Sequence, residues 1–307
     1  MQGPPPLPPP SPSLIFRTSG YQGYAVEFSP FFENRVAVAS AANFGIAGNG
    51  RLFVLHFDSS NNNVAQTHSF DAQDGLFDLC WSEANENQIV VSSGDGSIKV
   101  FDLGLKVTFP VLNLHEHTRE VFSVNWNLVR KDVFVSGSWD HSIKLWSPDS
   151  NHSISTWKEH AACVYSTVWS PHSPDRFASA SGILLAHTNE VLSLDWNKYD
   201  PNCLVTAGVD HSVKVWDIRN TSKDLLTLRG HDYAVRRVKC SPHAGNIVAS
   251  AGYDMTMRMW DTSRGFNNLV RVHDRHTEFV LGVDFSLFVK GLVATCAWDE
   301  TVHLFHV

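Results

Sequence analysis

The 307-residue sequence lacks the features that mark most membrane, secreted and nucleic-acid-binding proteins. No apolar run approaches the roughly 18 residues of a membrane-spanning helix, and no apolar secretory segment follows the N-terminus. Its five cysteines are scattered without a CxxC pair, which argues against a disulfide framework or a zinc site and favours a reducing compartment. Charged residues make up only 18% and the net charge is −7, so we expect no nucleic-acid partner.

Motifs of common enzymes are also missing. The sequence contains no GxSxG, no P-loop GxxxxGK[ST] and no HExxH. A glycine-rich segment at residues 43–50 follows a strand-like stretch, but no helix pattern opens after it, which argues against a phosphate cradle. We therefore expect no enzymatic activity, no cofactor and no bound metal.

One unusual segment opens the chain, because residues 1–13 are rich in proline. Such a segment favours extended polyproline II conformations and cannot pack a core. We expect a disordered tail at residues 1–13 and a single folded domain at residues 14–307.

From residue 20 onward the chain repeats itself. The copies read GDGSIKVFD, WDHSIKLW, VDHSVKVWD, YDMTMRMWD and WDETVHLF, at residues 94–102, 139–146, 209–217, 253–261 and 298–305. Their aspartates, Asp95, Asp140, Asp210, Asp254 and Asp299, are spaced by 45, 70, 44 and 45 residues. A period of about 45 residues, with tight turns between alternating strands, is typical of WD40 propeller blades and predicts an all-β fold.

A second constant within the repeats predicts buried hydrogen-bonded tetrads. Nineteen residues after a histidine comes a hydroxyl, four later an aspartate and six later a tryptophan. A buried aspartate needs donors, and the other side chains can supply them or relay them. The sets are His117, Ser136, Asp140 and Trp146; His187, Thr206, Asp210 and Trp216; His231, Ser250, Asp254 and Trp260; and His276, Thr295 and Asp299, with Phe305 in the tryptophan position.

One copy is broken after Gly182. His160 and Ser179 keep the spacing, but Ile183 and Asn189 stand where aspartate and tryptophan belong. The next repeat histidine, His187, arrives about 16 to 18 residues early, so the third and fourth strands of this copy are missing. We predict a seven-bladed propeller whose blade at about 160–186 is truncated after Gly182. Residues 14–18 are expected to pair with residues 301–307 and close the ring.

The repeat register also predicts a binding face. Starts of first strands and the residues before each turn aspartate should meet at one end of the propeller, where aromatic rings beside carboxylates suit an amphipathic basic peptide. The candidate peptide-binding residues are Asp74, Phe77, Asp78, Glu120, Phe122, Trp139, Tyr165, Glu190, Arg236, Tyr253, Glu278 and Trp298.

Segments outside the repeat pattern resemble the peroxisomal import receptors for type 2 targeting signals. The resemblance covers about residues 20–305 and rests on residues 23–30, 43–50, 74–78, 160–170, 178–182, 233–239, 276–279 and 298–300. It implies a non-enzymatic WD-repeat receptor for an N-terminal nonapeptide, Arg-Leu-x5-His-Leu, held as a helix on cargo proteins. It further implies a co-receptor (the type 1 signal receptor or an equivalent), a docking complex at the peroxisomal membrane, and a cytosolic protein that cycles to the peroxisome.

Two alternatives remain open from the sequence. Residues 216–219, Trp-Asp-Ile-Arg, resemble the WDxR motif of substrate adaptors of cullin-type ubiquitin ligases. Alternatively, the break after Gly182 makes this chain a truncated, non-functional form of the receptor.

Overall fold

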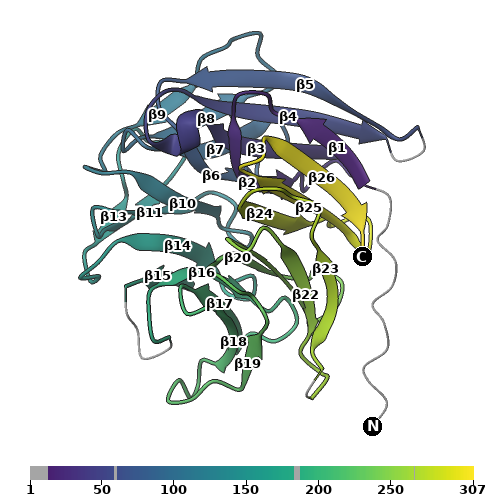
Figure 1. The fold of residues 1–307 in the computed structure, drawn as a ribbon. Helices are drawn as coiled ribbons and strands as arrows, with labels where there is room; N and C mark the ends of the chain where they lie inside the picture. Colours follow the sequence, from purple (N-terminus) through teal and green to yellow (C-terminus); the bar gives the residue numbers. More distant parts are fainter. Residues whose placement is uncertain (1–12, 59–60, 183–186, 266) are drawn as a thin grey trace.

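A closed ring of strands organises the computed structural model, which describes residues 13–58, 61–182, 187–265 and 267–307. Seven first strands surround the central axis, and each contacts the next around the circle (Figure 1). They are β2 (Gln22–Phe28), β6 (Leu76–Trp81), β10 (Val121–Trp126), β14 (Val164–Trp169), β16 (Val191–Trp196), β20 (Val235–Cys240) and β24 (Val280–Phe285). Within these ranges no helix is long and apolar enough to cross a membrane.

Outer strands pair antiparallel with these first strands to make radial sheets. The second strands are β3 (Arg35–Ala41), β7 (Gln88–Ser93), β11 (Phe134–Ser138), β15 (Phe177–Ser181), β17 (Cys203–Gly208), β21 (Ile247–Gly252) and β25 (Leu292–Ala297). The third strands are β4 (Gly50–Asp58), β8 (Ile98–Asp102), β12 (Ile143–Trp146), β18 (Ser212–Asp217), β22 (Met257–Asp261) and β26 (Thr301–His306). The outermost are β5 (Asn63–Ala72), β9 (Leu112–Leu114), β13 (Ser155–Trp157), β19 (Leu226–Arg229), β23 (Leu269–His273) and β1 (Ser13–Arg17).

The structure has six four-stranded blades and not the seven blades expected, because the copy predicted to be truncated forms only a two-stranded sheet. Six sheets have four strands, whereas β14 and β15 form a sheet of two. The break occurs where the repeat register placed it, because β15 ends at Ser181 and residues 183–186 lie outside the described part of the chain. The expected tail at residues 1–13 lies outside it too, except for Ser13, which begins β1.

Apolar clusters fill the spaces between neighbouring sheets. Between β6–β9 and β10–β13, for example, Cys80, Val100, Val124 and Trp126 pack together. Among the described residues, the cluster between β14–β15 and the next sheet is smaller: Ala180, Val191 and Leu194 are buried, and Val168, Ala178 and Leu204 pack against them. Stabilisation scales with the apolar area buried, so the described residues of this cluster contribute less than those of the larger clusters.

The tetrad side chains make the hydrogen bonds that their spacing predicts. His117 pairs through Nδ1 with Asp140 Oδ2 at 2.8 Å and through Nε2 with Ser136 Oγ at 2.7 Å, while Trp146 Nε1 donates to that hydroxyl at 2.8 Å. The same pattern joins His187, Thr206, Asp210 and Trp216, and also His231, Ser250, Asp254 and Trp260. His276 bonds to Asp299 and Thr295 without an indole.

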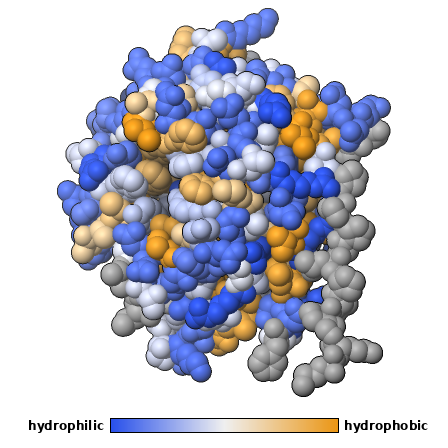
Figure 2. All heavy atoms as spheres, viewed as in Figure 1, coloured by the Kyte–Doolittle hydropathy of each residue, from blue (hydrophilic) through white to orange (hydrophobic). Residues whose placement is uncertain are grey.

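The ring is closed by pairing between its two ends. β1 pairs antiparallel with β26, with Leu14 opposite Leu304 and Phe16 opposite Val302. Figure 1 shows β1 beside β26, so the N-terminal strand completes the C-terminal sheet and covers its edge. From the same side, Figure 2 shows apolar patches separated by hydrophilic side chains.

Candidate functional site

A repeated backbone hydrogen bond builds one end of the propeller. The residue before each turn aspartate donates its N–H to the carbonyl that precedes a first strand: Trp139 to Glu120 at 3.0 Å, Tyr253 to Ala234 at 2.9 Å and Trp298 to Phe279 at 3.0 Å. The second-to-third-strand turns and the first-strand starts therefore meet at one end, which we call the turn face.

Aromatic rings form a continuous belt on the turn face. Phe122 stacks on Trp139 and on Phe77, with ring centroids 4.4 and 4.6 Å apart. Further contacts extend the series at both ends, to Tyr165 and to Tyr253. The aromatic belt comprises Tyr165, Trp139, Phe122, Phe77, Tyr24, Trp298, Phe279 and Tyr253. Six of its members are candidate binding residues from the sequence.

A loop that the sequence indicated only as a connection adds two apolar side chains to this face. Between β3 and β4 lies the short 3-10 turn η1 (Asn43–Gly45), and the ring centroids of Phe44 and Trp298 are 5.3 Å apart. Phe44 and Ile46 are exposed. The hydroxyl of Tyr24 donates to the Phe44 carbonyl at 2.6 Å, and the Phe44 N–H donates to Gln22 Oε1 at 2.8 Å. In the sequence, this loop is marked by the glycine-rich segment at residues 43–50.

Carboxylates flank the belt at several points. The hydroxyl of Tyr165 donates to Glu190 Oε2 at 3.4 Å, and Arg119 lies 3.5 Å from Glu120. Asp74 accepts a hydrogen bond from the N–H of Gly75. Glu278 is exposed next to Phe279 in the chain. Burial, and then the charge of Glu190, raises the pKa of Tyr165 to about 12, so this hydroxyl stays a neutral donor at neutral pH.

Three candidate residues are buried instead of lying open on the turn face, and the first is Phe77, which is 4% exposed. Asp78 is 5% exposed; its carboxylate accepts from Arg237 Nη2 at 2.9 Å and from the N–H of Val124 at 3.1 Å. Arg236 is 3% exposed, and its guanidinium lies 5.7 Å from the Phe122 ring centroid. The expectation that Asp78 presents a free carboxylate to a ligand is therefore wrong, because strand alternation turns it inward to Arg237.

Several donors at the turn face stand without partners among the described residues. Nε1 of Trp139, Nε1 of Trp298 and Nη2 of Arg236 are buried and lack a hydrogen-bond acceptor. Buried donors without acceptors cost free energy, and such costs are commonly offset where a ligand supplies the missing acceptor. Trp139 stacks on Phe122, Arg236 lies beside the Phe122 ring, and Trp298 contacts Phe279 farther along the belt.

Fold and repeat chemistry define the class: this is a WD-repeat β-propeller. The model of the WD domain, G-beta repeat, matches residues 64–102, 108–147, 178–217 and 222–261. The chain belongs to the family of peroxisomal targeting signal 2 receptors, whose members are non-enzymatic.

That membership rests on similarity over nearly the whole chain. The peroxisomal targeting signal 2 receptor of Saccharomyces cerevisiae is 36% identical, with 95% of this chain and 99% of the relative covered. The mouse receptor of the same name is 43% identical, with 96% and 97% covered. Peroxisome biogenesis protein 7 of Arabidopsis thaliana is 45% identical, with 92% and 95% covered.

Proposed function

We propose that this chain is a receptor that binds the N-terminal type 2 targeting signal of peroxisomal matrix proteins. Relatives in yeast and mouse carry that receptor name and align over nearly their full length. The observation that carries the proposal is the aromatic belt with carboxylates beside it, which suits an amphipathic basic helix.

In this proposal the targeting signal binds as a helix that packs its apolar side on the aromatic belt. Leucines of an Arg-Leu-x5-His-Leu signal pack on belt rings such as Trp139 and Trp298, where aromatic side chains give large contact area at low entropic cost. The arginine and histidine of the signal face Glu120, Glu190, Asp74 or Glu278, which draws the basic helix to an acidic chain. Acceptors on the bound helix satisfy Trp139 Nε1 and Arg236 Nη2.

Further partners belong to the same proposal. A co-receptor covers the exposed side of the bound helix, and the complex docks at the peroxisomal membrane, so the receptor cycles between cytosol and peroxisome. Support comes from the family membership and from Phe44 and Ile46, which stay exposed beside the belt and would extend the contact to a second protein.

The two-stranded sheet is, in this proposal, the remnant of a seventh blade, and the ring still functions. His160 Nε2 lies 2.7 Å from Ser179 Oγ, so half of a tetrad persists. β14 also keeps its contacts with β10 and β16, which leaves the turn face continuous. The similarity does not favour a ubiquitin-ligase adaptor, and Arg219 of the WDxR-like motif is already paired with Asp217 at 2.7 Å.

The test is binding of a fluorescein-labelled Arg-Leu-x5-His-Leu peptide, measured by anisotropy. The intact chain is expected to bind, and Glu120→Lys to weaken binding about tenfold or more, since a charge-assisted contact is worth about 1.5–3 kcal/mol. Glu159→Lys, an exposed charge reversal outside the candidate set, serves as the matched control. No binding with or without co-receptor, or equal loss in both variants, would refute the proposal.

A further inference from the structure

The end of the propeller opposite the turn face has a cavity and an apolar rim of its own. Each first strand runs from the turn face to this end, where loops lead to the second strands; we call it the loop face. Its central cavity has a volume of about 130 Å³, several times the share of one water molecule. It is lined by the last two residues of several first strands and by loop residues such as Leu128 and Leu287.

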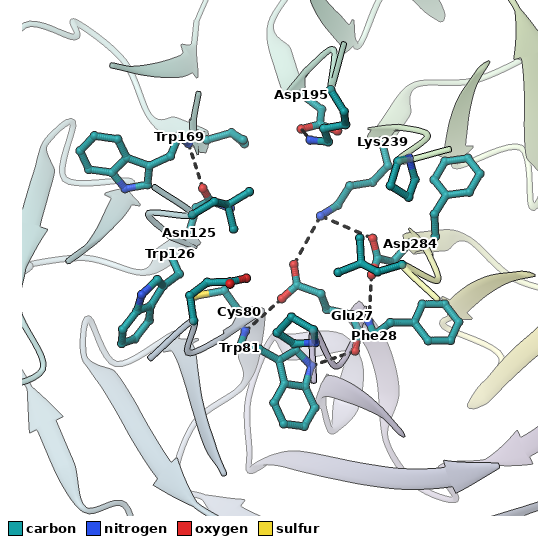
Figure 3. Close-up of a pocket in the computed structure, with 18 of the residues that line it drawn as sticks. Glu27, Phe28, Cys80, Trp81, Asn125, Trp126, Trp169, Asp195, Lys239 and Asp284 are labelled. Atoms are coloured by element: carbon teal, nitrogen blue, oxygen red, sulfur yellow. Dashed lines mark hydrogen bonds and ion pairs between the residues drawn. The ribbon is translucent and has the colours of Figure 1, made fainter. Parts of the chain in front are cut away.

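Charge in this cavity is unbalanced. Figure 3 shows the amino group of Lys239 between the carboxylates of Glu27 and Asp284, with N–O distances of 3.6 and 3.8 Å. The neighbouring acids have cations of their own: Lys198 lies 2.8 Å from Asp195 and Lys131 lies 3.7 Å from Glu83. Among the described residues, Lys239 is therefore the one cation that pairs with both Glu27 and Asp284.

These groups are open to the cavity rather than sealed. The side chains of Lys239, Glu27 and Asp284 keep 25%, 22% and 14% of their accessible surface. Burial raises the pKa of Glu27 to about 7 despite the opposing charge of Lys239, and burial also raises the pKa of Asp284. A second cation placed here would relieve both carboxylates.

Exposed apolar side chains crowd the loops around the cavity. Leu287 and Phe288, between β24 and β25, are 48% and 49% exposed, and Leu128, between β10 and β11, is 41% exposed. The loop-face rim consists of Phe31, Leu128, Val129, Tyr199, Leu287 and Phe288. Exposed apolar groups gathered around a charged depression are typical of protein-docking sites.

We propose that the loop face is a second docking surface, for a protein that inserts an arginine side chain into the Glu27–Asp284 cavity and packs apolar neighbours on the rim. Charge complementarity selects a basic anchor, since Glu27 and Asp284 share one lysine. An arginine fits better than a lysine because its planar fork bonds two carboxylates at once. This surface is separate from the proposed signal site, so both partners can bind together.

The experiment uses the full chain with its tryptophan indoles labelled with 15N. The probe is acetyl-Leu-Arg-Leu-Phe-amide, and its neutral control has citrulline in place of arginine. Trp81, Trp126 and Trp169 line the cavity, whereas Trp139 and Trp298 report on the turn face. The arginine peptide is expected to shift the three cavity indoles and leave the other two unchanged, and citrulline to bind about tenfold more weakly.

Two variants separate docking from folding. Glu27→Gln keeps an acceptor for the backbone N–H of Trp81, which lies 3.1 Å from Glu27 Oε2. This variant is expected to bind the probe peptide about tenfold more weakly. The double variant Leu287→Ser, Phe288→Ser should weaken binding comparably, and Glu159→Gln should not. All three should bind the Arg-Leu-x5-His-Leu peptide like the parent chain. Cavity indoles that do not shift, equal binding of the citrulline peptide, or unaffected probe binding in Glu27→Gln would overturn the proposal.

Discussion

At the residue scale, the tetrads show how hydrogen bonds stabilise a buried carboxylate inside an all-β protein. Asp140 accepts hydrogen bonds from His117, from the N–H of Thr118 and from both the N–H and hydroxyl of Ser142. These donors outweigh the cost of burial and hold the pKa of Asp140 well below its usual range. The aspartate thus ties a tight turn to the preceding segment.

Removing that carboxylate is expected to destabilise the fold. Asp140→Ala leaves the buried donors of His117 and Ser142 without acceptors, which costs about 1–3 kcal/mol of unfolding free energy. Urea denaturation followed by tryptophan fluorescence measures the loss. Asp132→Ala, which breaks only the exposed pair with Arg130, is the control and should change stability by about 0.5 kcal/mol or less. Equal stability of the two variants would contradict the tetrad's role.

Single belt residues should dominate signal binding. Trp139→Ala removes a ring that stacks on Phe122 and an indole N–H without a partner, so the affinity for the signal peptide should fall more than tenfold. Tyr199→Ala removes an exposed ring from the loop face and should leave that affinity unchanged. Anisotropy titration compares the two, and a similar affinity for both variants would exclude the belt as the binding surface.

At the element scale, β1 has an influence out of proportion to its five residues. It pairs with β26 and buries Leu14 against residues of the next sheet, including Val36 and Phe53. It therefore joins the first and last elements of the chain and removes an open edge.

Deleting residues 1–17 should lower the melting temperature and promote self-association, because β26 would then expose unpaired N–H and C=O groups. Deleting residues 1–12 alone leaves β1 in place and is the matched control. Differential scanning fluorimetry and analytical ultracentrifugation report the two effects. Identical melting temperatures for the two deletions would show that β1 does not close the ring.

Completing the two-stranded sheet is expected to stabilise the protein. Residues 210–226 contain the turn aspartate and the tryptophan of the intact sheet β16–β19. The repeat spacing calls for the same two residues after Gly182, where this chain lacks them. Inserting a copy of them after Gly182 should complete the tetrad begun by His160 and Ser179 and bury more apolar area beside Ala180. The insertion should raise the unfolding free energy, measured by urea denaturation, without weakening signal binding. A scrambled insert of the same composition is the control.

At the scale of the whole molecule, stability should depend on pH through the closing blade. His273 Nε2 lies 3.0 Å from His303 Nδ1, both rings are buried, and burial lowers the pKa of each to about 3. In the unfolded chain they titrate near 6.5. Protonation therefore favours the unfolded state, and the stability present above pH 6.5 is lost as the pH falls toward 3.

The expected slope between pH 6.5 and 4.5 is positive, with up to about 1.4 kcal/mol per pH unit from each histidine. Glu27 opposes it in part, because its raised pKa makes stability fall as the pH rises from 4.5 to 7. Urea denaturation at several pH values measures the net slope. His303→Gln stays neutral and should flatten the curve; an unchanged slope would show that this pair does not control the acid response.

The sequence alone determined the repeat register, and with it much of the fold. The spacing between His117, Ser136 and Asp140 repeats because each blade requires the same buried hydrogen bonds, so the sheets and the break after Gly182 could be located from residues alone. That register also brought Trp139, Tyr253 and Trp298 to one end, since strand alternation and turn position are local properties.

Tertiary structure decided which of those residues are free to bind. Asp78 meets Arg237, 159 positions away in the sequence, and Phe44 meets Trp298 across the join between the first and last blades. The loop-face cavity likewise combines Glu27, Lys239 and Asp284 from three blades. No local spacing encodes such encounters, because they depend on how the ring closes and on which side chains its narrow channel forces together.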